Sequence, residues 1–166
     1  MPKKKNSDMP RDHEMPAPAT AEDWARCEAV AREHGRTFFF ASRFLPRLRR
    51  EAMLAAYAWC RVADDIVDNA SDLGAKAAAA TELDRWEAQL DAPSDPIAIA
   101  FAAARARYAI PVEPARELIA GLRMDLERSR YANWAELRTY CHLVAGTVGL
   151  ISAPALGCRD AWALKH

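Results

Sequence analysis

The segment from Leu54 to Asp68 constrains the fold more than any other part of the sequence. At about 100° per residue, an α-helix over this segment gathers its polar side chains within roughly a 60° arc. The members of this polar stripe are Tyr57, Arg61, Asp64 and Asp68. Apolar side chains project from the opposite face, at Ala55, Trp59, Val62 and Ile66. The pattern predicts a long helix that is packed on one face and lines a polar feature on the other.

Asp64 and Asp68 stand one helical turn apart, and Arg61 precedes them by one turn. Two neighbouring carboxylates are unfavourable to bury without a cation or a charged ligand. Mg²⁺ prefers oxygen ligands and binds through one or two carboxylates plus phosphate oxygens, and Mn²⁺ accepts similar ligands. The stripe therefore suggests a metal and diphosphate site. An exposed helix end whose acids pair with nearby arginines explains the spacing equally well.

Composition favours one soluble globular domain without a nucleic acid partner. The 166 residues are 51% hydrophobic, with 23 basic and 23 acidic side chains and no long run of one sign. The four cysteines form no Cys-x-x-Cys pair and no secretory signal precedes them, so we expect reduced thiols in a cytoplasmic protein. A zinc site is the weaker alternative, because no histidine stands at ligand spacing from a cysteine pair.

The sequence predicts an all-α fold, since it contains neither useful strand alternation nor a glycine-rich phosphate loop. Residues 1–20 are rich in proline and charge and are expected to form a disordered leader. Helices are expected over residues 21–34, 47–68, 75–90, 97–108, 114–130 and from 134 to an end at Pro154 and Gly157, with one more helix starting at 159. Thr20 with Asp23 forms a capping pattern, Asn133 can cap the helix from 134, and Pro96 and Pro114 suit first helical turns.

Two apolar segments have uncertain roles in the sequence. The aromatic run Phe38, Phe39, Phe40 and Phe44 is more typical of a core than of a cofactor site. The run from Leu143 to Gly157 is shorter than the roughly 20 residues of a membrane-spanning helix, and glycines and a proline interrupt it. A buried core helix is the expectation, and peripheral contact with a membrane stays open.

Four segments, in this order, resemble the squalene and phytoene synthase family, and most closely its bacterial phytoene synthases. They are His34–Pro46, Ala56–Asp68, Leu118–Leu126 and Tyr140–Gly149. The resemblance implies an isoprenoid (terpenoid) synthase-like helical bundle with a central cavity. It also implies that two prenyl diphosphates condense head to head through a cyclopropyl diphosphate, with Mg²⁺ required. Geranylgeranyl diphosphate would give phytoene, and farnesyl diphosphate would give squalene-type products.

The resemblance also carries roles onto residues. Asp64 and Asp68 match the first aspartate-rich metal motif, whereas Asp65 lies outside the stripe and is not expected to be a principal ligand. Tyr57 and Arg61 match residues that orient the diphosphate. The expected substrate-binding residues are His34, Arg36, Thr37 and Phe38 near the diphosphate, Asp125 on a mostly apolar helix face, and Tyr140, Val144, Ala145, Val148 and Gly149 along the prenyl-chain cavity.

The family carries a second aspartate-rich motif after the segment resembling Leu156–His166, which is where this sequence ends. Residues 21–166 are therefore expected to be the N-terminal part of an isoprenoid synthase domain, apparently truncated and inactive alone. Two alternatives remain. One is a non-catalytic assembly or binding protein on the same fold. The other is a head-to-tail prenyl synthase or terpene cyclase, because Asp64–Asp68 also fits an Asp-Asp-x-x-Asp motif. Substrate chain length and oligomeric state are not determined by the sequence.

Overall fold

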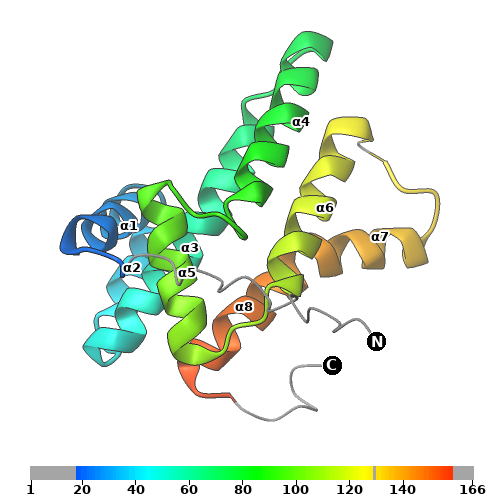
Figure 1. The fold of residues 1–166 in the computed structure, drawn as a ribbon. Helices are drawn as coiled ribbons and strands as arrows, with labels where there is room; N and C mark the ends of the chain where they lie inside the picture. The colour runs from blue at the N-terminus through cyan, green and yellow to red at the C-terminus, as the bar shows by residue number, and fades with distance from the viewer. Residues whose placement is uncertain (1–17, 129, 159–166) are drawn as a thin grey trace, which may run out of the picture.

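The computed structural model describes residues 18–128 and 130–158 and contains only helices within them, which confirms the all-α prediction (Figure 1). The helices are α1 (Ala21–His34), α2 (Arg36–Ser42), α3 (Arg47–Asp68), α4 (Leu73–Ala88), α5 (Pro96–Tyr108), α6 (Glu113–Glu127), α7 (Trp134–Cys141), the π-helical η1 (His142–Gly146) and α8 (Thr147–Leu156). The expected leader falls mostly outside the described residues, as does the helix expected from residue 159.

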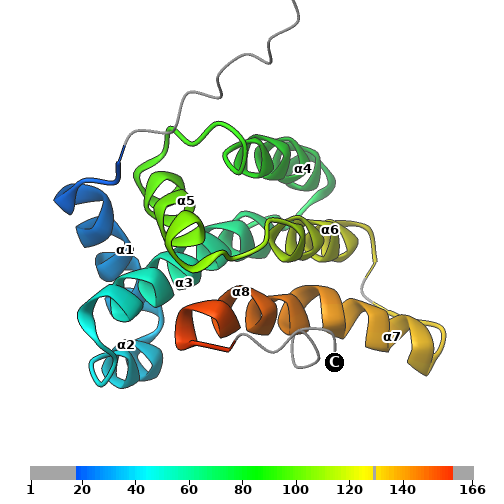
Figure 2. The same cartoon turned by 60° about the horizontal axis from the view of Figure 1, so that its bottom comes forward.

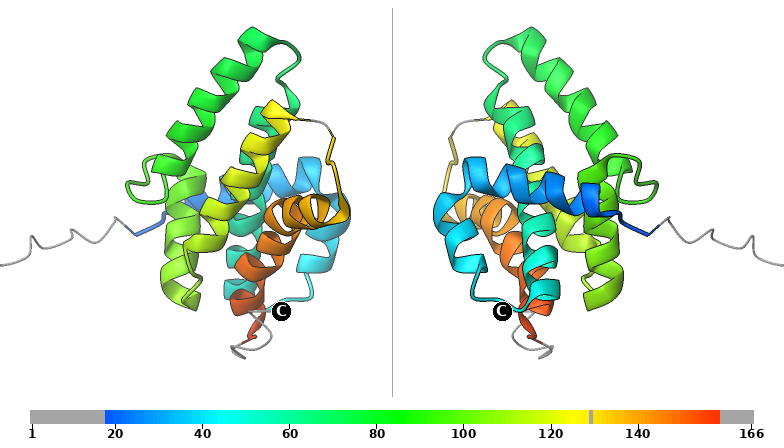
Figure 3. Two further views of the ribbon diagram at one scale, coloured as in Figure 1. Left: turned by 90° about the vertical axis from the view of Figure 1, so that its right-hand side faces the viewer. Right: turned by 90° about the vertical axis from the view of Figure 1, so that its left-hand side faces the viewer.

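Helix α3 is the centre of the bundle. Helices α1 and α5 pack against it and against each other, while α6 and α8 pack against it from another side (Figure 2). The right-hand view of Figure 3 shows α1 crossing α3 steeply. Buried alanines from Ala52 to Ala63 line much of α3, so neighbouring helices can approach its backbone closely.

Local sequence determines where several helices begin. Thr20 and Asp23 form the predicted capping box at α1: the Thr20 amide donates to Asp23 Oδ2 at 2.7 Å, and the Asp23 amide donates to Thr20 Oγ1 at 3.3 Å. Asp95 caps α5 ahead of Pro96. Asn133 caps α7, as predicted. These side chains satisfy amides that have no partner inside the helix.

The apolar face of α3 carries the core. Trp59 is fully buried and its ring stacks on Phe101 of α5 and Trp86 of α4, at centroid distances of 5.2 and 6.0 Å. The Trp86 indole N–H donates to the Trp59 carbonyl oxygen at 3.2 Å. These contacts join three helices through one residue of α3.

The aromatic run of α2 does not form one core cluster. Phe38 and Phe39 pack against the core, as expected, but Phe40 is 60% exposed and Phe44 is 80% exposed. The core prediction is therefore wrong for these last two residues. The reason is geometric: α2 has seven residues and packs only one face against α1 and α3, and Phe44 lies beyond its last residue, Ser42.

Helices α7, η1 and α8 form one continuous stretch, Trp134–Leu156, along an outer side of the bundle (Figure 2). Pro154 lies inside α8, and the helix ends at Gly157, whose φ of +99° is left-handed. Only 17% of the most apolar 18-residue part of this stretch is buried. The prediction of a core helix is therefore wrong for most of the stretch. By length and composition alone, its 23 residues meet the criterion for a membrane span, as core helices of soluble proteins also do.

Candidate functional site

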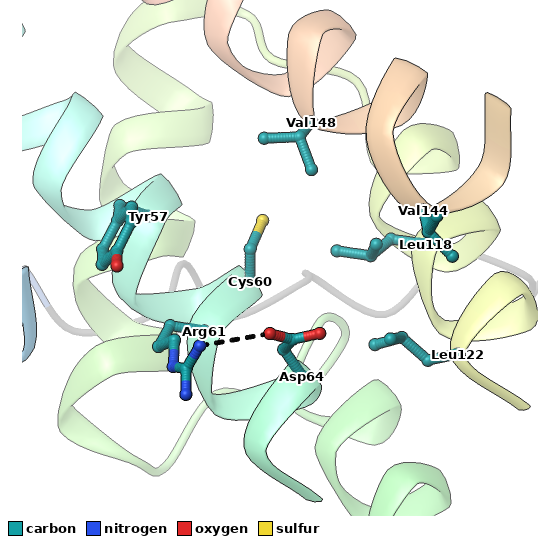
Figure 4. A pocket seen from close by; sticks show the side chains of 8 residues that line it. All are labelled: Tyr57, Cys60, Arg61, Asp64, Leu118, Leu122, Val144 and Val148. Carbon is teal, nitrogen blue, oxygen red and sulfur yellow. Dashed lines mark hydrogen bonds and ion pairs between the residues drawn. The ribbon is translucent and has the colours of Figure 1, made fainter. Parts of the chain in front are cut away.

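A pocket of about 230 Å³ lies between α3, α6 and the η1–α8 stretch (Figure 4). Its lining combines three polar side chains of α3 with apolar side chains of all four segments. The lining residues are Tyr57, Cys60, Arg61, Asp64, Leu118, Leu122, Val144 and Val148. Three members of the predicted polar stripe therefore face a cavity together.

Arg61 is held in the polar wall by two carboxylates. Its guanidinium donates to Asp64 at 3.3 Å and also forms an ion pair with Asp65. The Nε–H of Arg61 is buried and has no partner among the described residues. A planar guanidinium fixed by carboxylates can still present donors to phosphate oxygens.

Tyr57 is fixed by the segment between α1 and α2. Its ring stacks on Phe38 at a centroid distance of 4.8 Å and an interplanar angle of 17°. A Cβ added at Gly35 would lie 2.6 Å from the Tyr57 ring and hydroxyl, so only glycine fits there without a shift of the ring. The sequence around Gly35 thus brings α2 against the polar wall.

The opposite wall is apolar. Leu118 and Leu122 come from α6, and Val144 and Val148 come from η1 and α8. Gly121 allows these elements to meet, because a Cβ there would lie 2.7 Å from Leu143 Cβ. The cavity is consequently polar at one wall and apolar at the other, which suits an amphiphilic ligand with a charged head.

Negative charge is concentrated on α3 beside the pocket. Burial raises the pKa of Asp64, and the nearby Asp68 carboxylate raises this pKa further. Asp125 acts in the same direction more weakly, while Arg61 opposes the shift. A bound cation would relieve this repulsion. Within residues 18–128 and 130–158, no group of three or more His, Cys, Asp or Glu side chains is placed to hold a metal.

Asp125 is fixed beside this charge by a tyrosine from the next helix. The Tyr140 hydroxyl donates to Asp125 Oδ2 at 2.9 Å, and the Tyr140 ring stacks on Tyr131 at 4.9 Å. Burial raises the pKa of Tyr140, and so does its hydrogen bond to Asp125. Tyr140 therefore stays a neutral donor that positions the Asp125 carboxylate.

The other predicted site residues lie at varying distances from the pocket lining. Asp68 is exposed at the end of α3, and His34, Arg36 and Thr37 are exposed around the α1–α2 junction. Ala145 and Gly149 are exposed and do not line this pocket. Around Gly149, no atom lies within 4 Å of an added Cβ.

Three residues that line the pocket were not predicted as site residues, namely Cys60, Leu118 and Leu122. Cys60 lines the pocket, and burial followed by the Asp64 charge raises its pKa to about 12, so it remains a neutral thiol. Asp65 is not in the pocket lining but binds Arg61. Helical spacing could have indicated both, since Cys60 stands one turn from Asp64 and Asp65 one turn from Arg61.

A protein-family model described as squalene/phytoene synthase matches residues 31–166. Phytoene synthase 3, chloroplastic, from Zea mays is 43% identical over 143 residues, which are 82% of this chain and 32% of the relative. The phytoene synthase of Arthrospira platensis is 37% identical over 154 residues, which are 88% of this chain and 48% of the relative. The chain thus spans between about a third and a half of these curated relatives.

Solved structures show the same fold. The squalene synthase HpnC from Alicyclobacillus acidocaldarius superposes with a TM-score of 0.71 at 32% identity, over 87% of this chain and 55% of the other. A dehydrosqualene synthase solved in complex with ligand gives a TM-score of 0.69 at 27% identity, over 81% of this chain and 47% of the other. These neighbours confirm the isoprenoid synthase-like helical fold predicted from the sequence.

Proposed function

Because this chain belongs to the squalene/phytoene synthase family, we propose that the protein joins two prenyl diphosphates head to head in isoprenoid and carotenoid biosynthesis. Curated relatives that are 37–43% identical to this chain are phytoene synthases, which favours geranylgeranyl diphosphate as substrate and phytoene as product. Farnesyl diphosphate and a squalene-type product form the second choice, supported by the two solved structures.

The observation that carries this proposal is the division of the pocket into two walls. Arg61 and Asp64 stand on one side, and Leu118, Leu122 and Val148 stand on the other (Figure 4). A prenyl diphosphate has the same division, with an anionic head on a hydrocarbon chain. The match between wall and ligand supports binding of the head at α3 and of the chain along α6 and α8.

The carboxylates of α3 fit a divalent cation shared with the substrate. Burial and the neighbouring Asp68 carboxylate raise the pKa of Asp64 despite the opposing Arg61, and Asp68 is exposed at the end of α3, which supports binding of a cation here. Asp64 and Asp68 would therefore hold Mg²⁺, or Mn²⁺ in its place, together with diphosphate oxygens. When bound, the cation orients the diphosphate and neutralises charge as it leaves.

The remaining residues of the site would bind the substrate and stabilise the carbocation that forms when an allylic diphosphate ionises. Arg61 donates to diphosphate oxygens, which holds the leaving group at α3. The stacked rings of Tyr57 and Phe38 present aromatic faces beside the same wall, and such faces stabilise positive charge. The apolar wall of α6 excludes water that would quench a carbocation. Asp125, positioned by Tyr140, adds a third carboxylate near the head group.

We place this chemistry in the cytoplasm, in contact with a membrane, since the hydrocarbon product has no polar group to keep it in water. The relatives from Zea mays and Arabidopsis thaliana, in contrast, are chloroplastic enzymes.

The test is incubation with radiolabelled geranylgeranyl and farnesyl diphosphates and Mg²⁺. Two proteins are assayed: the 166-residue chain, and a chimera in which it replaces the matching segment of the Arthrospira platensis phytoene synthase. We expect the chimera to form a hydrocarbon product that depends on Mg²⁺. A folded chimera that binds neither diphosphate nor forms hydrocarbon would refute the proposal. Binding without turnover would favour the non-catalytic alternative.

A further inference from the structure

The corner between α2 and α3 exposes an apolar patch formed by Phe40, Phe44 and Leu48. Their exposed fractions are 60%, 80% and 49%. The rings of Phe40 and Phe44 meet edge to face, with centroids 5.8 Å apart. The two phenylalanines therefore form one continuous apolar surface rather than two isolated exposures.

Within the described residues these side chains are largely exposed, and their neighbours in the sequence provide the inward contacts of α2. Phe38 stacks on Tyr57, and Phe39 lies between the guanidinium groups of Arg32 and Arg50, each 5.3 Å from the ring centroid. Exposed aromatic rings gain no packing energy in water, so this patch is better suited to a partner with an apolar phase.

The charge around the patch is positive. From Arg36 to Arg50 the sequence contains five arginines and no carboxylate. Three of them are engaged: Arg47 with Glu51, Arg49 with the Leu156 carbonyl oxygen, and Arg50 with Glu28. The other two, Arg36 and Arg43, are exposed and have no ion-pair partner within the described part of the chain.

Two carboxylates near this corner, Glu28 and Glu51, are already paired with arginines. On α1, Glu28 binds both Arg32 and Arg50, whereas Glu33 has only His34 nearby, at 3.8 Å. On α3, Glu51 binds Arg47 at 2.9 Å. The corner therefore combines apolar rings with excess positive charge, which is the composition of surfaces that bind anionic lipid headgroups while inserting side chains into the interface.

We propose that the α2–α3 corner, with Phe40, Phe44 and Leu48 inserted and Arg36 and Arg43 at the rim, docks on an anionic lipid bilayer. The purpose of this contact rests on the proposed function, because a hydrocarbon product leaves water for a bilayer. On the inner side of the same short helix, Phe38 touches Tyr57 of the pocket. Docking through this corner thus brings the pocket close to the lipid phase.

The test is co-sedimentation of the 166-residue chain with vesicles, in the absence of Mg²⁺ and prenyl diphosphate. Vesicles contain equal parts phosphatidylglycerol and phosphatidylcholine, or phosphatidylcholine alone. We expect binding to the anionic vesicles that weakens as salt is raised. The double variant Phe40→Ser/Phe44→Ser should bind at least about tenfold more weakly, since two exposed rings lose their buried area. Arg43→Gln should bind about fivefold more weakly.

Matched controls change similar side chains elsewhere. Leu73→Ser replaces an apolar residue that is 88% exposed, and Arg85→Gln removes an exposed arginine of α4. Both should bind anionic vesicles as the unmodified chain does. All variants alter solvent-facing side chains, and circular dichroism should show unchanged helix content. Arg43→Gln retains both rings, so it tests the proposal even where the double variant fails to fold.

Several results would overturn the inference. These are equal binding to neutral vesicles, unchanged binding by Arg43→Gln, or loss of binding only in Trp134→Ser, which would assign the contact to α7. Loss of self-association in the double variant without loss of vesicle binding would assign the patch to a second copy of the chain. The vesicle experiment contains no substrate, so it tests docking separately from catalysis. If the chain binds vesicles through this corner but the turnover assay gives no hydrocarbon, only the proposed function is refuted.

Discussion

The two faces of α3 differ in burial and charge, although Trp59 on one face and Asp64 on the other stand only five residues apart. Trp59 is fully buried and stacked between two other aromatic rings, whereas the Asp64 side chain, little more than one turn later, is 48% exposed beside a cavity. The Trp59 face is stabilised by packing within the chain, although the buried Trp59 indole N–H has no hydrogen-bond partner among the described residues. On the Asp64 face, burial and the nearby Asp68 carboxylate raise the pKa of Asp64, and a bound cation would relieve this repulsion.

This difference separates stability from function along one helix. Residues on the Trp59 face should change the free energy of unfolding strongly when truncated. Residues on the Asp64 face should change it little, or even raise it, while changing ligand binding strongly.

The largest expected effect on stability is at Trp59. Trp59→Ala removes the ring that joins α3, α4 and α5, and we expect a loss of about 3–5 kcal/mol in the free energy of unfolding. Urea denaturation followed by circular dichroism measures it. Trp134→Ala is the matched control, because that ring is 74% exposed and should change stability by less than about 0.5 kcal/mol. Equal losses would contradict the assignment of the core to this face.

Substituting two glycines near the site should change the free energy of unfolding by smaller amounts, and the two changes should have opposite signs. Gly121→Ala places a Cβ 2.7 Å from Leu143 Cβ and 2.9 Å from Val144 Cγ1, and should cost about 1–3 kcal/mol. Gly149→Ala meets nothing within 4 Å and should stabilise its helix by up to about 1 kcal/mol. The same denaturation experiment compares them. A stabilising Gly121→Ala would show that α6 and η1 do not pack as closely as described.

The smallest stability effect is at Asp64, measured without divalent cations. Its folded pKa is raised above the unfolded value of 3.8, so the charged form at pH 7 costs stability that is regained as the group binds a proton. Asp64→Asn should therefore raise the free energy of unfolding at pH 7, by less than about 1 kcal/mol because the side chain is half exposed. The gain should disappear below pH 3.8.

Asp84→Asn is the control for this measurement. Asp84 accepts a hydrogen bond from Arg123 at 2.6 Å, so its replacement removes an attraction rather than a repulsion. With Asp84→Asn, the free energy of unfolding at pH 7 should stay unchanged or fall slightly. An Asp64→Asn variant that is less stable than the unmodified chain at pH 7 would mean that Arg61 already compensates the Asp64 charge.

Short-range chemistry made much of the fold predictable from sequence. The Thr20–Asp23 capping box and Asn133 identified helix starts, and Pro96 and Pro114 lie in first helical turns as expected. Periodicity alone predicted which face of α3 is packed and which face is polar. The failures depend on tertiary packing. Nothing local to α2 shows that Phe40 faces solvent while Phe39 lies between arginines of α1 and α3.

The end of the last helical stretch was predicted in part. Gly157 ends it as expected, and the Cys158 amide donates to the Ala153 carbonyl oxygen at 2.9 Å, but Pro154, also expected to mark the end, sits within the last turn. No periodic pattern in the sequence predicts the π-helical turn His142–Gly146. This turn packs closely against Gly121 of α6, which is a tertiary contact. In the pocket, periodicity placed Asp64 correctly on the stripe, yet the second partner of Arg61 is Asp65.

The most direct test of this account is turnover of the chimera with Asp64→Asn, compared with Asp84→Asn and the unmodified chimera. We predict that formation of labelled hydrocarbon falls about a hundredfold or more with Asp64→Asn, at unchanged helix content, because the diphosphate loses a carboxylate that holds its cation. Asp84→Asn should retain full turnover. Near-normal turnover of Asp64→Asn would show that the polar face of α3 is not the metal and diphosphate site.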